Sequence, residues 1–500
     1  MNFKRCFSIL AFIMLLLICI NGISATSDDS IALQSDNAST NNDISPQNSS
    51  ENDSPQPITP YEKLKNDLAS GADTVYLTED VKVNETLSIT NNVIIDAKGH
   101  TLDGGYNTRI FKVVDCKLTI KNAVLRNGFS DNGGAIYCLR ANLAVDNCKF
   151  INNKATKNGG AICVCHGNLN VMNSYFEANG VRSNDLNGHG GAIWLYDGSS
   201  YISKSTFKSN YCISNILKNH KQAAKYGFKG GAIYITHGSS HIITKSKFIG
   251  NKVSNDGGAI YIYNSGYVKI EGCRFSSNKV VFEDGGAIVF TGSKLVLKSS
   301  IFYKNRAYED GGAIDSFSLT KKKIYIQIIK CTFNRNTAYK GGGAIWMGLK
   351  TVYSMKNNKF TNNRATIGGA IYCQDGIVKI YKCLFTSNKA KKVTSWKVKA
   401  KRGGVLHHSG GAILIQKKNV KITKSVFKKN SADYGGSLFF LGGKLKIKYN
   451  TFLSNNAKKY AKEICASKKL KISNKNKWTA KKLSSKKALK NKKLFINVSV

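Results

Sequence analysis

The chain has 500 residues and a formal net charge of +45 at pH 7, from 75 basic and 30 acidic residues. This charge predicts that the protein collects on polyanions such as cell-wall polymers, acidic glycans or anionic lipids. The thirteen cysteines are scattered, and their spacing fits neither a disulfide framework nor a zinc site.

The first 25 residues are predicted to be a signal peptide. Lys4 and Arg5 precede an apolar run at residues 7–20, and a cleavage site follows at Ala25. An uncleaved anchor helix is the alternative, although the run is short for a full membrane span. No later stretch is apolar enough to cross a bilayer. We therefore expect a secreted mature chain without a transmembrane span, free or held non-covalently at the cell surface or cell wall.

Residues 26–59 are expected to form a disordered acidic linker. The segment 26–60 holds six acids, no lysine or arginine, and all four prolines of the chain. Charge is divided sharply beyond it, because residues 26–115 have a net charge of −9, whereas residues 116–500 hold 67 basic and 15 acidic residues, net +52. The C-terminal part is therefore the part expected to meet a polyanion.

Residues 60–132 predict an N-terminal cap and the opening coils of a repeat. Thr59-Pro60-Tyr61-Glu62 has the form of a capping box with proline at the first helical position, which predicts a short helix from about Pro60 to Ala69. Such a helix would cover the open strand edge of the first coil. The segments VIIDAKGHTLDGG and LTIKNAVLRNG form a degenerate first repeat.

Residues 133–455 contain eleven copies of one motif pair. Each copy has Gly-Gly, followed in ten cases by Ala-Ile, and then Phe-x-x-Asn downstream. The second glycine lies 16 or 17 residues before the phenylalanine in ten copies, whereas the return to the next Gly-Gly varies more. Each copy therefore combines a segment of fixed length with one corner whose length varies, which we call the elastic corner, and the two together have about 26 residues. This organisation is typical of one coil of a stacked solenoid.

Apolar and polar residues alternate within each copy, as in Val-Lys-Ile at residues 268–270 and 420–422. This period predicts strands, and we expect three short strands in each coil. Stacked coils would align the phenylalanines as a ladder of rings and the asparagines as a ladder of amides. The Cys, Ser or Asn two residues before each Phe would form a buried ladder of small residues, with paired thiols as the alternative.

The paired GGAI and F-x-x-N motifs resemble the repeat of the chlamydial polymorphic outer membrane proteins. They resemble still more closely the adhesin-like proteins of methanogenic archaea. The resemblance covers residues 133–455. It implies a right-handed parallel β-helix of the pectin-lyase-like class, so the expected fold is an all-β solenoid with a short N-terminal capping helix.

Residues 456–500 are expected to finish the last coil and to form a lysine-rich C-terminal cap. Residues 468–493 hold twelve lysines and no acid. This segment could retain the protein on an anionic wall, or could simply give the cap a soluble surface.

One position of the repeat, three residues after the second glycine, is aromatic in seven of its eleven copies. Its neighbours on both sides are expected to face inward. We therefore expect an exposed row that stacks on sugar rings or on a partner's apolar patch, with mere stabilisation of the strand face as the alternative. A basic insertion at residues 389–409 adds one more tryptophan. The candidate ligand-binding residues are Tyr137, Trp194, Tyr234, Tyr261, Trp346, Tyr372, Trp396 and Phe439.

Asp256, Asp284 and Asp310 hold the same place, just before Gly-Gly, in three consecutive coils. Stacked carboxylates repel one another unless a cation or a lysine intervenes. The column could bind calcium, could serve a lyase, or could be ordinary turn chemistry. No catalytic residue and no cofactor are predicted, with calcium at this column as the alternative.

Three functional hypotheses follow. The first is an exported, cell-surface adhesin-like β-helix that binds glycans or neighbouring cell surfaces without catalysis. The second is a polysaccharide lyase-like enzyme that acts on an acidic glycan, and the third is a basic structural coat protein of the cell wall. Expected partners are anionic cell-wall polymers, glycans or other cell surfaces, and no nucleic acid. The sequence leaves the ligand and the oligomeric state open.

Overall fold

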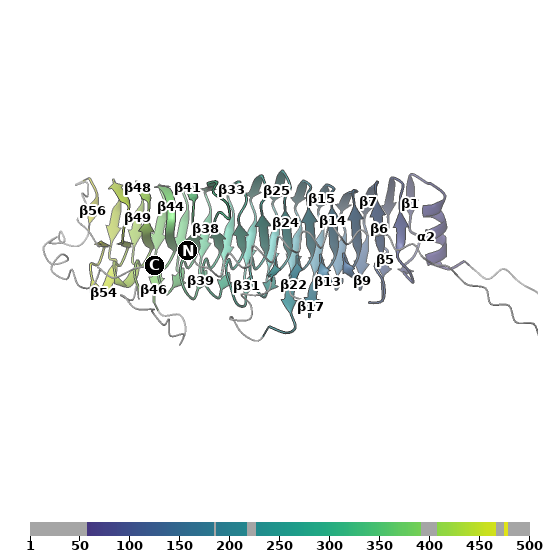
Figure 1. Ribbon diagram of the computed structural model, residues 1–500, viewed down its shortest axis with the longest axis horizontal. Coiled ribbons are helices and arrows are strands. Elements are labelled where there is room, and N and C mark those ends of the chain that lie inside the picture. Colours follow the sequence, from purple (N-terminus) through teal and green to yellow (C-terminus); the bar gives the residue numbers. More distant parts are fainter. Residues whose placement is uncertain (1–57, 185–186, 218–226, 392–407, 467–474, 479–500) are drawn as a thin grey trace, which may run out of the picture.

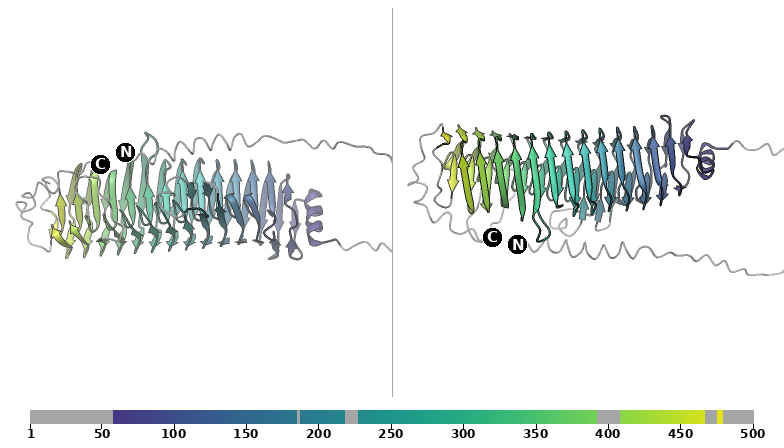
Figure 2. Two further views of the ribbon diagram at one scale, coloured as in Figure 1. Left: turned by 60° about the horizontal axis from the view of Figure 1, so that its bottom comes forward. Right: turned by 90° about the horizontal axis from the view of Figure 1, so that it is seen from above.

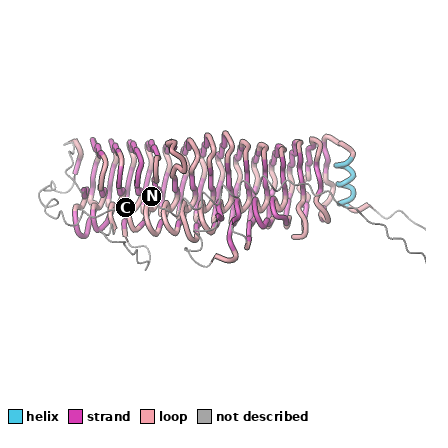
Figure 3. Tube along the Cα trace, viewed as in Figure 1, coloured by secondary structure: helices cyan, strands magenta, loops and turns pink. Residues whose placement is uncertain are grey.

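The computed structural model describes residues 58–184, 187–217, 227–391, 408–466 and 475–478. They form a straight rod of stacked coils with a single helix at one end (Figure 1; Figure 3). About 13 turns of about 27 residues make an all-β, right-handed parallel β-solenoid, which confirms the predicted fold class. The predicted signal peptide, most of the acidic linker and most of the lysine-rich C-terminal segment lie outside the described residues.

Each regular coil has four short strands, one more than the sequence predicted. In the coil that begins at Gly257 they are β28 (Ile260–Tyr263), β29 (Tyr267–Glu271), β30 (Arg274–Ser276) and β31 (Lys279–Val280). In the next coil they are β32 (Ile288–Phe290), β33 (Lys294–Lys298), β34 (Ile301–Tyr303) and β35 (Arg306–Ala307). The unpredicted strand follows directly after the asparagine of Phe-x-x-Asn.

The strands build three long parallel sheets along the rod (Figure 2). A 27-stranded sheet contains the first two strands of the coils, such as β28 and β29. A 15-stranded sheet contains the phenylalanine strands, from β2 (Val81–Lys82) to β56 (Lys477–Trp478). A 14-stranded sheet contains the fourth strands. Equivalent residues stack from coil to coil, because the pairing is in register: Phe275 lies on Phe302 and Lys279 on Arg306.

The predicted ladder of phenylalanine rings forms the centre of the core. From Phe150 to Phe452, successive ring centroids lie 4.7 to 5.0 Å apart and successive planes differ by at most 9°. All eleven rings are buried. The stacking distance equals the spacing of hydrogen-bonded strands, so one ring is added for each coil.

The predicted ladder of asparagine amides lines the next corner. From Asn153 to Asn455, each Nδ2 donates to Oδ1 of the asparagine in the next coil at 2.9 to 3.1 Å. The last amide, Asn455, donates to the buried carboxylate of Glu463 at 2.7 Å, which ends the ladder. Burial raises the pKa of Glu463.

The small residues before the phenylalanines form the expected buried ladder. In one step, the backbone N–H of Cys273 donates to Oγ of Ser300 at 3.1 Å. All eleven cysteines within the described ranges are free thiols, so the alternative of paired thiols is wrong there. The serines and asparagines of this column accept a hydrogen bond from a backbone N–H of the coil before them, as Ser174 does from Cys148 and Asn358 does from Cys331.

The Gly-Gly pairs are required by the corner that they form. Gly285 has φ of +68°, a conformation that side chains with a Cβ adopt only with strain. A Cβ on Gly286 would lie 2.2 Å from the carbonyl oxygen of Gly312 in the next coil. Neither position therefore tolerates alanine without a local shift of the backbone.

The helix α2 (Pro60–Ala69) covers one end of the rod, as predicted (Figure 1). The Oγ1 of Thr59 accepts a hydrogen bond from the backbone N–H of Glu62 at 3.2 Å, which is the expected N-cap. Tyr61 and Leu64 are buried against the first coils. In the part of the chain that the structure describes, no helix is both long and apolar enough to cross a membrane.

Candidate functional site: the acidic column and the cationic ladder

The aromatic row is not an exposed surface, which corrects the prediction. Tyr234, Tyr261, Trp346, Tyr372 and Phe439 are only 1% to 8% exposed, and Tyr137 and Trp194 are half-buried. Their side chains do point away from the central core, as expected. However, they form apolar clusters of their own on the other side of the strands.

The cover over the row is the chain segment that precedes each Gly-Gly. The ring of His189 lies 4.6 Å from that of Tyr234, and Nζ of Lys229 lies 5.1 Å from the ring centroid of Tyr261. The elastic corner is long enough to fold back across the outer face, so large rings there are removed from water as in a second core. Burial therefore favours the alternative that the row stabilises the strand face. Trp396 lies outside the described residues.

The acidic column is part of this cover, and its carboxylates bond to the backbone of neighbouring coils. The backbone N–H of Asp284 donates to Oδ1 of Asp256 at 3.2 Å, and that of Asp310 donates to Oδ1 of Asp284 at 2.8 Å. Asp284 and Asp310 are only 4% and 3% exposed. These contacts are turn chemistry repeated from coil to coil.

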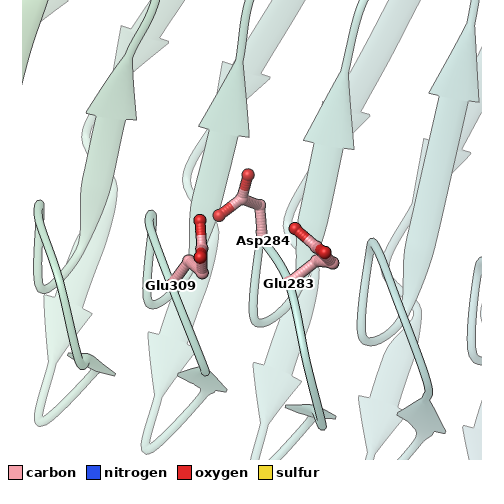
Figure 4. A group of neighbouring side chains, drawn as sticks. All are labelled: Glu283, Asp284 and Glu309. Atoms are coloured by element: carbon pink, nitrogen blue, oxygen red, sulfur yellow. The ribbon is translucent and has the colours of Figure 1, made fainter. Parts of the chain in front are cut away.

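Two glutamates beside the column come close enough to Asp284 to hold a cation together with it. Glu283, Asp284 and Glu309 have oxygen atoms within 4.8 Å of one another (Figure 4). Carboxylate oxygens are ligands that calcium prefers. At the C-terminal end of the column, Nζ of Lys340 lies 3.3 Å from Oε2 of Glu309 and 3.5 Å from Oδ2 of Asp310. A lysine therefore relieves part of the repulsion between the carboxylates.

The fourth strands place a row of basic residues on the outside of the rod, along the lower edge in Figure 1. We call this row the cationic ladder; it consists of Lys252, Lys279, Arg306, Arg364 and Lys389, with Thr337 between the two arginines. These residues start six consecutive strands: β27 (Lys252–Val253), β31, β35, β39 (Thr337–Ala338), β43 (Arg364–Ala365) and β46 (Lys389–Ala390). Each residue pairs in register with the next.

The rest of this sheet continues the line without a run of cations. Its other strands are β9 (Phe129–Asn132), β13 (Lys154–Asn158), β17 (Gly180–Ser183), β18 (Asn187–His189), β22 (Tyr211–Ser214), β23 (Gly227–Lys229), β50 (Ser431–Tyr434) and β54 (Asn456–Tyr460). Strands β17 and β18 lie in an insertion at this corner, residues 180–189, and strands β22 and β23 begin and end a second one, residues 211–229.

Four members of the cationic ladder face solvent without a paired carboxylate among the residues that the structure describes. Lys252, Lys279, Arg306 and Lys389 are exposed, and within the described ranges no ion pair joins any of them to a carboxylate. Elsewhere, basic side chains do pair, as Arg140 does with Asp115 at 2.6 Å. Desolvation and the charges of Arg306 and Lys252 lower the pKa of Lys279.

Sequence analysis missed the cationic ladder, although its signal is present. Six of the eleven copies continue Phe-x-x-Asn with Lys or Arg and then Ala or Val, as in Asn278-Lys279-Val280. The alternation is only two residues long, which is too short to stand out as a strand. Its inner members, such as Val253 and Val280, form a small apolar cluster of their own.

A family model of the right-handed β-helix region matches residues 202–391 and 324–476, which together span more than half of the chain. The chain belongs to the right-handed β-helix family. Within this β-helix, a model of the Chlamydia polymorphic membrane protein repeat matches residues 147–165, the segment with Phe150, Asn153 and one GGAI motif. No curated protein matches the chain. Membership shows the fold and leaves the chemistry open, because β-helices of this kind include lyases as well as surface proteins that are not enzymes.

Proposed function

We propose that this β-helix is an adhesin-like protein displayed outside the cell, where it binds anionic glycans or wall polymers without changing them chemically. The observation that carries the proposal is the cationic ladder on a rigid rod, since four of its members, Lys252, Lys279, Arg306 and Lys389, are exposed and form no ion pair within the described residues. Rigid scaffolds with regular outer faces favour binding to extended polymers, because little conformational entropy is lost on the protein side.

Display at the surface is supported by the repeat that the chain shares with chlamydial polymorphic membrane proteins. It is also supported by the signal peptide that the sequence predicts. The net charge of +52 over residues 116–500 favours retention on an anionic wall even without a covalent anchor.

A non-catalytic role is supported by the surroundings of the acidic column. A lyase or hydrolase needs an acid or base that reaches the polymer. Asp284 and Asp310 are buried under the corner and accept or flank backbone hydrogen bonds instead. The half-buried Glu309 is held by Lys340.

The test is a binding screen of the purified chain against neutral glycans, acidic glycans and isolated cell walls, at low and at high salt, together with protease shaving of intact cells. We expect salt-sensitive binding that prefers particular acidic glycans, and removal of the protein by external protease. Uniform binding to every polyanion would favour the structural coat protein. Shortening of the glycan would favour the lyase, and protection from protease would contradict display.

A further inference from the structure

The cationic ladder has a geometry that a general basic surface lacks. Its basic residues occupy one straight line parallel to the axis of the rod, since they pair in register on consecutive parallel strands. From Lys252 to Lys389 the line covers five coil steps of about 4.8 Å, or about 24 Å. The coil step is confirmed by the phenylalanine centroids, 4.8 Å apart at Phe275 and Phe302.

Like charges that face each other across strands are destabilising. Desolvation, and after it the charges of Arg306 and Lys252, lower the pKa of Lys279. Glu309 and Asp310, which follow Arg306 on its coil, pair with Lys340, and within the described residues no ion pair joins Lys252, Lys279 or Arg306 to a carboxylate. A ladder of this kind would gain most from an external anion that carries one charge for each coil step.

From this juxtaposition we infer that the cationic ladder is the binding site for a linear acidic polysaccharide, which lies along the rod and carries one carboxylate or sulfate on each sugar. The inference rests on the proposed function and specifies where the polymer binds. An extended glycan with one charge per sugar repeats at about the step of the coils, so its charges fall opposite the cations at five of the six positions and opposite Thr337 at the fourth. The partner is fixed by charge and spacing, and no pocket is needed.

A single-stranded nucleic acid fits the same face less well. Proteins that bind it without sequence preference stack its bases on exposed aromatic faces. Beside the ladder, the guanidinium of Arg306 covers the ring of Tyr339 at 4.6 Å, and Tyr308 and Tyr339 pack edge to face at 5.4 Å. These rings therefore pack against Arg306 and against each other. A sugar carboxylate or sulfate needs only the cations.

The experiment compares two triple variants of the full chain that lose the same charge. The ladder variant is Lys252→Gln, Lys279→Gln and Arg306→Gln. The control variant is Lys112→Gln, Lys149→Gln and Lys359→Gln; all three lysines are exposed, and their neighbours in register are uncharged: Ser88, Tyr137, Val124, Tyr175, Thr332 and Leu384. The probes are oligogalacturonates of increasing length and a single-stranded oligonucleotide of matched charge, measured by titration at several salt concentrations.

We expect the ladder variant to bind oligogalacturonate about tenfold or more weakly and to lose about 2 from the slope of log K against log salt, by analogy with single-stranded polyanions. We expect the control variant to change affinity less than about threefold, since it removes only distant charge. Affinity of the parent chain should rise with oligomer length until the oligomer spans the ladder. Removal of repulsion should raise the melting temperature of the ladder variant, whereas a structural role would lower it.

Equal losses in the two variants would overturn the inference, because net charge rather than the ladder would then explain binding; the proposed function would then rest on the preference for particular acidic glycans in the binding screen. A loss confined to the oligonucleotide would also overturn it, in favour of nucleic acid. Absence of glycan binding by the parent chain would instead contradict the proposed function itself.

Discussion

Replacement of Asn305 by alanine should strongly destabilise the middle of the rod. The Nδ2 of Asn305 donates to Oδ1 of Asn336 and to the carbonyl oxygen of Phe275, both at 3.0 Å. Its Oδ1 accepts from the backbone N–H and from Nδ2 of Asn278, at 3.1 and 2.9 Å. The site is 0% exposed, so water cannot replace these partners without a rearrangement of the coils.

The magnitude follows from what remains unpaired. The backbone N–H of Asn278 loses its partner in a buried site, which costs about 1–3 kcal/mol, and the other three bonds contribute about 1 kcal/mol each. We therefore expect Asn305→Ala to lower the free energy of unfolding by about 4–6 kcal/mol. In a stacked array the loss falls on the coils that contact the site, so unfolding should also become less cooperative.

The assay is equilibrium unfolding in urea, followed by circular dichroism and by limited proteolysis. The matched control is Asn419→Ala, which removes an exposed asparagine from β48 (Asn419–Thr423) and should change stability by less than about 0.5 kcal/mol. A loss below about 1 kcal/mol for Asn305→Ala would refute the reasoning, since the ladder would then add little to stability.

Three further predictions concern the corner, the thiols and pH. Gly286→Ala should cost at least about 3 kcal/mol and reduce soluble yield, because its Cβ would meet the Gly312 oxygen at 2.2 Å; wild-type stability would contradict the tight corner. Cys165 should be the first thiol to react with a disulfide reagent in the native chain, since hydrogen bonds from Cys163 and Tyr137 lower its pKa. Burial, in contrast, raises the pKa of Cys273 to about 12. Mass mapping that finds Cys273 modified before Cys165 would contradict this prediction. Burial lowers the pKa of His189 to about 3, so the unfolded chain takes up the proton first as pH falls below about 6.5. The contribution of neutral His189 to stability is therefore lost toward low pH, by up to about 2 kcal/mol at pH 5. The variant His189→Asn should lose less stability between pH 7.5 and pH 5 than the parent chain. Equal losses in the two proteins would show that the pKa of His189 is not lowered by folding.

The sequence predicted the phenylalanine ladder, the asparagine ladder and the N-terminal cap, because each of these features depends on local rules. The phenylalanine and asparagine columns follow from fixed spacing, since residues at equal positions on stacked coils must meet. The helix at Pro60–Ala69 follows from the capping box alone. None of these features depends on the path of the chain outside the regular strands.

The exposure of the aromatic row could not be predicted in the same way. The alternation of apolar and polar residues along a strand shows to which face each side chain points, and Tyr234 and Trp346 do point away from the central core. Whether another segment covers them depends on the elastic corner, whose length varies and whose return path no periodicity fixes. The fourth strand was missed for the related reason that two residues carry almost no periodic signal.

The acidic column was recognised as a column, but its environment was not. The sequence placed Asp256, Asp284 and Asp310 on consecutive coils with Glu283 and Glu309 beside two of them, and the structure adds that oxygen atoms of Glu283, Asp284 and Glu309 lie within 4.8 Å of one another. Lys340 holds the same place as Glu309, three residues before the second glycine of its coil, so the repeat spacing could have placed the two side by side, and sequence analysis missed this pairing.

The central claim, binding of an acidic glycan without chemical change, is tested most directly by one incubation. The full chain is mixed with polygalacturonate and with calcium, and the bound fraction, the polymer length and the ultraviolet absorbance of unsaturated uronate are followed together for a day. The account predicts binding that salt reverses, constant polymer length and no new absorbance. Shortened polymer or rising absorbance that disappears in Asp284→Asn would contradict it and would make the acidic column catalytic.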